Sequence, residues 1–85
     1  MAELEKRIGV VGIVIEDREN GVKIVNDILS KYAEIIVGRM GIPYRERKIA
    51  VISLIVDGTT DEIGAMTGLL GAVSGVNVKS ALTRK

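Results

Sequence analysis

The fold is decided by two stretches of the sequence, Ile-Gly-Val-Val-Gly-Ile-Val-Ile at residues 8–15 and Ile-Ala-Val-Ile-Ser-Leu-Ile-Val at residues 49–56. Both are short runs rich in β-branched residues, and each ends at polar or turn-forming residues, which predicts two strands. The runs are apolar at nearly every position instead of at alternate positions. Such strands are typically buried on both faces of a sheet.

A helix is predicted after the first strand. The turn at residues 16–19 is charged, and a helical period of apolar residues then begins, made of Val22, Val25, Ile28, Leu29 and Tyr32. Asp17 and Asn20 are both candidates for the residue that caps this helix.

The segment between the two apolar runs predicts one further strand, over residues 34–40. Gly41-Ile42-Pro43-Tyr44 follows, and we expect it to break that strand, because proline has no amide to donate to a sheet.

A second helix is predicted after Asp57-Gly58. Thr59 and Glu62 match a capping box, in which the two residues bond each other's backbone amides at a helix start. This helix should reach about Val73, with Gly75 as its terminator and residues 76–82 as the last strand.

The predicted order is strand, helix, strand, strand, helix, strand. It is the α+β, ferredoxin-like βαββαβ two-layer sandwich, with four strands and both helices on one face. The two halves echo one another, since Ile15 aligns with Val56 and Val22 with Ile63. A chain of 85 residues accommodates one such domain, over residues 1–85.

The two apolar strands predict self-association. Two helices cover one face of the sheet, so another copy of the chain is the simplest cover for the other face, giving a homo-oligomer such as a dimer or tetramer. The alternative is that Gly9, Gly12, Ala50 and Ser53 line a weakly apolar face that stays open.

Composition removes several classes of function. The formal charge is only +1, unlike that of a dedicated nucleic-acid binder, so direct nucleic-acid binding is not expected. The chain has neither cysteine nor histidine, so we expect no metal site and no cofactor. Its first residues do not resemble a signal peptide and no apolar run is long enough to span a membrane, which predicts a cytoplasmic protein without membrane contact.

No catalytic residues are expected. Without histidine or cysteine, the serines have no recognisable partner base. The acidic residues near the two helix starts match no calcium-binding loop. We therefore expect a protein that is not an enzyme.

Three glycines of the second helix, Gly64, Gly68 and Gly71, fall on one stripe. Each should cost the helix roughly 1 kcal/mol relative to alanine. One interpretation is close packing of the stripe against the sheet or the first helix. The other is a smooth wall for a ligand or a partner subunit.

The charges suggest two unlike ends. If the first and third strands run parallel, the turns at residues 16–19 and 57–62 lie together at an acidic end, beside both helix N-termini. The opposite end is then basic, with Lys6, Arg7, Arg45, Arg47, Lys48, Arg84 and Lys85. This division is interpreted either as complementarity to the helix dipoles or as a docking site for an anion, an acidic protein or nucleic acid.

Three segments resemble a known family along nearly the whole chain. They are residues 15–19 (Ile-Glu-Asp-Arg-Glu), residues 39–45 (Arg-Met-Gly-Ile-Pro-Tyr-Arg) and, most specifically, residues 63–79, which begin Ile-Gly-Ala-Met-Thr-Gly-Leu-Leu-Gly. These blocks are similar to the iron-only hydrogenase system regulators, small stand-alone proteins of ACT-like ferredoxin fold. The resemblance implies a regulatory role connected with that hydrogenase system, including a protein partner from it, and it carries no established ligand residues.

Such proteins also resemble the nickel-binding domain of nickel-responsive repressors. That domain holds its metal through histidine and cysteine, which are absent here, so nickel sensing is not carried over. By analogy with ACT domains, we expect any small-molecule ligand at the turn after the first strand, near Asp17, Arg18, Asn20 and Gly21, with the glycine stripe as a wall.

Two alternatives to a ligand-binding sensor stay open. One is a structural interaction module whose basic end docks an acidic protein. The other is a transcriptional regulator associated with DNA.

Overall fold

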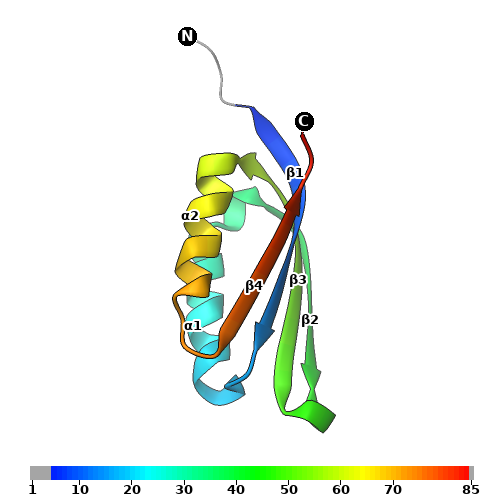
Figure 1. The fold of residues 1–85 in the computed structure, drawn as a ribbon, viewed down its shortest axis with the longest axis vertical. Helices are drawn as coiled ribbons and strands as arrows, with labels where there is room; N and C mark the ends of the chain where they lie inside the picture. The colour runs from blue at the N-terminus through cyan, green and yellow to red at the C-terminus, as the bar shows by residue number, and fades with distance from the viewer. Residues whose placement is uncertain (1–4, 85) are drawn as a thin grey trace.

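The computed structural model describes residues 5–84 and has the order βαββαβ (Figure 1). Its elements are β1 (Lys6–Ile15), α1 (Arg18–Lys31), β2 (Ile36–Tyr44), β3 (Ile49–Thr59), α2 (Thr60–Gly71) and β4 (Val76–Leu82), with short 3-10 helices η1 (Ala33–Ile35) and η2 (Arg45–Arg47) on either side of β2. No helix in this part of the chain is long and apolar enough to cross a membrane.

The four strands form one antiparallel sheet in the order β2-β3-β1-β4. Both helices lie on the same side of it, as Figure 1 shows. The predicted α+β, ferredoxin-like fold is confirmed. The predicted parallel direction of the first and third strands is wrong, because β1 and β3 are antiparallel neighbours over their whole length, from Lys6 opposite Thr59 to Ile15 opposite Ala50.

The core lies between the sheet and the helices. Alternate residues of β1 and β3 point into it, among them the fully buried Val11, Ile13 and Leu54. The helices contribute aliphatic side chains at a helical period, including Leu29 from α1 and Met66 from α2. Because no aromatic residue is among these buried side chains, the core depends on tightly interlocked branched aliphatic groups.

Side-chain caps fix both helix starts. Asp17 caps α1, and its Oδ1 accepts a hydrogen bond from the Asn20 amide at 3.3 Å, so the helix begins before the apolar period does. The predicted capping box of α2 is confirmed: the Glu62 amide donates to Thr59 Oγ1 at 3.1 Å, and the Thr59 amide donates to Glu62 Oε1 at 2.9 Å.

The second strand differs from the prediction. It starts at Ile36, after η1, and continues through the expected break as far as Tyr44, with Pro43 opposite Ala50. Proline is tolerated there because β2 is an edge strand, so one side of its backbone needs no partner. The chain turns instead at η2, where Lys48 adopts a left-handed conformation with φ of 57°.

Charges are mixed at both ends of the molecule, which corrects the expected acidic and basic ends. With β1 and β3 antiparallel, the turn at residues 16–19 lies at one end and the turn at residues 57–62 lies at the other. For the same reason Arg45, Arg47 and Lys48 are separated from Arg84 along the length of the sheet. Lys85 lies outside the described residues.

The capping box predicts a defined loss of stability in acid. Hydrogen bonds from the Thr59 amide and hydroxyl hold the pKa of the Glu62 carboxyl below its usual value of 4.5. Because the folded pKa is below the unfolded one, ionised Glu62 stabilises the fold above that value, and the contribution is lost as the pH falls through the folded pKa. In urea unfolding, Glu62→Gln should therefore lose less stability than the wild type between neutral pH and a pH below 4.5.

Asp61→Asn is the matched control, since it removes a neighbouring carboxylate that has no capping bond. The free energy of unfolding of this variant should change with pH as that of the wild type does. Equal acid losses in the wild type and Glu62→Gln would contradict the role given to the cap.

Candidate functional site

Three separate segments meet at the end of the molecule where β1 stops. They are the β1–α1 turn at Glu16 and Asp17, the η2 turn with Lys48, and the loop before β4. The Glu16 amide donates to the Gly75 carbonyl at 2.8 Å, and the Asn77 side-chain amide donates to Glu16 Oε2 at the same distance. The β1–α1 turn is therefore tied to the start of β4. Gly75 suits this loop because its φ of 76° is disfavoured for other residues.

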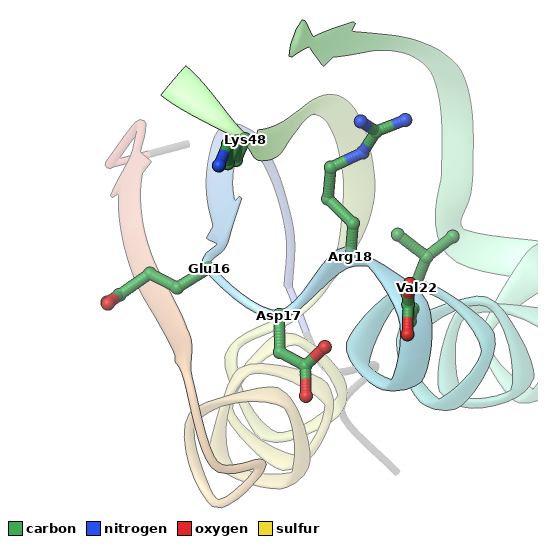
Figure 2. Close-up of a pocket in the computed structure, with 6 residues that line it drawn as sticks. Glu16, Asp17, Arg18, Val22 and Lys48 are labelled. Atoms are coloured by element: carbon green, nitrogen blue, oxygen red, sulfur yellow. The ribbon is translucent and has the colours of Figure 1, made fainter. Parts of the chain in front are cut away.

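A hollow of about 580 Å³ lies between the β1–α1 turn and η2. Its lining is Glu16, Asp17, Arg18, Glu19, Val22 and Lys48. Figure 2 shows the Arg18 side chain extending toward the side on which Lys48 lies, while the Asp17 carboxylate points the opposite way. Asp17 is also occupied in capping α1, with a further bond from Asn20 Nδ2 to its Oδ2 at 3.1 Å.

A second hollow, of about 300 Å³, lies on the other side of this turn. Asn20 and Gly21 line it, together with Ile24 and the loop at residues 73–75. It shares Glu16 and Asp17 with the first hollow, so the turn forms a wall between them.

A narrower groove of about 230 Å³ continues the first hollow along the side of α1 that faces β2. Arg18 and Val22 line both spaces, and the groove also reaches Asn26 and Arg39. Arg39 Nη2 donates to Asn26 Oδ1 at 2.8 Å. Arg18, by contrast, has no hydrogen-bond or ion-pair partner among residues 5–84, so its guanidinium is available to a bound molecule.

Four of the predicted ligand residues, Asp17, Arg18, Asn20 and Gly21, therefore line adjoining hollows at one end. The geometry gives Gly21 a packing role as well. A Cβ there would lie 2.5 Å from Ile15 Cγ2, so the missing side chain lets α1 approach β1.

The glycine stripe is placed differently. Gly64, Gly68 and Gly71 are exposed on the outer surface of α2, and a Cβ at any of them would meet nothing within 4 Å. The interpretation that the stripe packs closely within the chain is wrong. These glycines also line none of the three hollows described above.

Lys48 and Arg39 are site residues that the sequence reasoning did not place here. Lys48 was assigned to the far end because the first and third strands were taken as parallel; the antiparallel direction brings it beside Arg18. Arg39 lies inside the strand predicted over residues 34–40, but its face depends on the β2–β3 register, which sets its side chain on the helix side of the sheet, opposite Leu54.

The described residues hold no arrangement that suggests metal chemistry. Across residues 5–84, no three acidic side chains are grouped closely enough to hold a metal ion. The site is thus a set of open, mixed-charge hollows with one unpaired guanidinium, suited to binding a small charged molecule.

Comparison with known proteins gives a family match and a close structural relative. Residues 7–80 match the family model described as "TM1266-like: Iron-only hydrogenase system regulator, putative". The TM1266 protein of Thermotoga maritima is 42% identical, with a TM-score of 0.90 over 94% of this chain and 100% of that one. No curated protein matches the chain.

Of two more distant structures, the one with a TM-score above 0.5 shares the fold alone. A protein from Galdieria sulphuraria has 17% identity and a TM-score of 0.68, covering 98% of this chain and 53% of its own. A nitrogen regulatory PII-like protein from Thiomonas intermedia K12 has 15% identity and a TM-score of 0.49, over 98% of this chain and 96% of that one. At these identities neither likeness transfers a ligand or an activity.

Two glycine substitutions should have opposite effects. Gly21→Ala forces a methyl group against Ile15 and should destabilise the fold by about 1–3 kcal/mol, as overpacking does. Gly68→Ala adds a methyl group in open space and should stabilise α2 by about 1 kcal/mol. Urea unfolding of both variants measures the two changes in stability. If both substitutions changed the stability in the same direction, the packing role of Gly21 would be refuted.

Proposed function

The chain belongs to the TM1266-like family of iron-only hydrogenase system regulators, and we propose that it regulates such a system by binding rather than by catalysis. The observation that carries the proposal is Arg18, which lines two connected hollows and lacks a partner among the described residues. Arg18 is partly buried as a residue and its side chain extends into the hollow, so its guanidinium can bond an anionic ligand without giving up another partner.

The ligand proposed is a small molecule with an anionic group. We place that group near Arg18 and Lys48, the two cationic residues of a hollow that Glu16, Asp17 and Glu19 also line. Arg39 lies farther along the groove. Arginine favours carboxylate and phosphate groups because its donors match two oxygens at once. Asp17, Asn20 and Gly21 shape the adjoining wall, while no role in this site is assigned to Gly64, Gly68 or Gly71.

The module is further proposed to work as a cytoplasmic single-domain oligomer. Support for the oligomer comes from β1 and β3, which carry apolar side chains on both faces while the helices cover only one. A partner from the hydrogenase system is then recognised by the assembled protein.

Thermal unfolding tests the ligand site. Differential scanning calorimetry in the presence of amino acids, nucleotides and inorganic anions should find a compound that raises the melting temperature, since a ligand of the folded state adds about 2.7 kcal/mol at one hundred times its Kd. Arg18→Gln should abolish that shift. Arg84→Gln removes the same charge at the opposite end and should retain it. A shift retained in Arg18→Gln, or no shift with any compound, would contradict this site.

A second candidate is docking of an acidic partner or DNA through η2. Arg45, Arg47 and Lys48 are exposed there on consecutive or near-consecutive positions. A gel-shift titration with salt separates the two partners: sequence-independent DNA binding that disappears near physiological salt would rule out operator recognition. The separation of these residues from Arg84 weakens this candidate, because the basic charges no longer share one surface.

A further inference from the structure

The sheet face that points away from the helices is a continuous apolar surface. The strand register places Val10 beside Ile55, and Val51 between Ile42 and Val14, on this face. Six of its large side chains are between 43% and 63% exposed: Ile8, Val10, Met40, Ile42, Tyr44 and Ile55. Figure 1 shows no element of the chain on this side of the sheet.

The size of the surface argues for a permanent cover. Half-exposed large side chains leave roughly 100 Å² each, so these six expose on the order of 600 Å², the upper limit for a typical monomer. The neighbouring Val14, Ile49 and Val51 are partly exposed and extend the patch. The total approaches the ~800 Å² that each partner buries in a standard stable interface.

The charge pattern of the face favours a partner of the same kind. Its centre is formed by Ser53 beside Gly12, which are uncharged and small. Its charged residues lie on the edge strand and near the strand ends: Lys79 on β4, opposite Gly12, Lys6 at the start of β1 and Asp57 near the end of β3. The interior of the face offers few charges to an acidic or basic partner. It offers matching apolar side chains to another sheet of the same shape.

We infer that this face packs against the same face of a second copy of the chain, forming a sandwich of two sheets. Aligned sheets pack about 10 Å apart with interdigitated side chains, and two copies supply equal twist and matching aliphatic groups. An isologous contact of this type closes on itself and leaves no apolar face free. Because the net charge is only +1 per chain, electrostatic repulsion between the two copies is small.

This inference rests on the proposed oligomer but not on the proposed ligand. It also leaves the hollow at Arg18 open, because none of the residues that line that hollow belongs to the apolar face, although the groove beyond it shares Ile42 and Val51 with that face. Tyr44 and Ile49 place the margin of the interface beside the η2 turn, so the second copy lies next to the segment that carries Lys48.

Light scattering after size-exclusion chromatography tests the surface. Wild-type protein at micromolar concentration should have about twice the 9.1 kDa chain mass, or a multiple of that dimer. Val10→Lys and Ile55→Lys should each reduce the mass to that of one chain. The control is Leu69→Lys, because Leu69 is 45% exposed on the outer surface of α2, and this variant should remain assembled.

Thiol labelling covers the case in which a lysine variant fails to fold. The chain has no cysteine, so Ser53→Cys places a single thiol at the centre of the face and Ser30→Cys places one on exposed α1. Ser53→Cys should be labelled more slowly than Ser30→Cys, and its rate should rise on dilution as the copies separate.

The outcomes distinguish a failure of the proposed oligomer from a failure of the proposed interface. A stable wild-type monomer, with Ser53→Cys labelled at the same rate at all concentrations, overturns both the oligomer and the interface. An oligomer that survives Val10→Lys and Ile55→Lys but is broken by Leu69→Lys overturns this face alone and points to α2. Neither result alters the ligand test at Arg18.

Discussion

The architecture depends on one imbalance, a four-stranded sheet that is apolar on both faces and has two helices to cover one of them. The helix side is closed by interlocking aliphatic groups from β1, β3, α1 and α2, without any buried aromatic residue. On the other side, residues such as Val10 and Ile55 remain about half exposed. In so small a domain the second face holds apolar surface comparable to what a protein interface buries, and it is carried by the same strands whose alternate residues form the core.

Strand direction determines which charged residues share an end. The antiparallel pairing of β1 with β3 brings the β1–α1 turn close to η2, and so Arg18 close to Lys48. It also separates the two helix N-termini, each with its own side-chain cap, Asp17 for α1 and Thr59 for α2. Asp17, whose carboxylate caps α1, also lines the hollow. Because that carboxylate accepts hydrogen bonds from Asn20, it orders the turn and does not pair with the guanidinium of Arg18.

Much of the fold could be predicted from local patterns. The capping box at Thr59 and Glu62 and the bounds of β4 follow from short-range chemistry and appear in the structure. Of the two candidate caps for α1, Asp17 and Asn20, the structure uses Asp17. The course of β2 could not be predicted in this way, because Pro43 breaks a central strand but not an edge strand, and edge position is a tertiary property. The error in strand direction had the larger effect, since it moved Lys48 to the wrong end, and Arg39 was missed because its face depends on the β2–β3 register. The exposure of Gly64, Gly68 and Gly71 likewise depends on which face of α2 meets the sheet.

The bare outer surface of α2 has a consequence for motion. Gly64 and Gly68, inside a helix of 12 residues, cost about 2 kcal/mol of helical propensity relative to alanine, and a Cβ at either would meet nothing within 4 Å. The helix is held by its cap and by Ile63, Met66 and Leu70, which point into the core. The low propensity favours local opening of α2, so its amides should exchange faster than those of the central strands β1 and β3. The fold thus pairs a helix of low intrinsic helical propensity with an extensively hydrogen-bonded sheet.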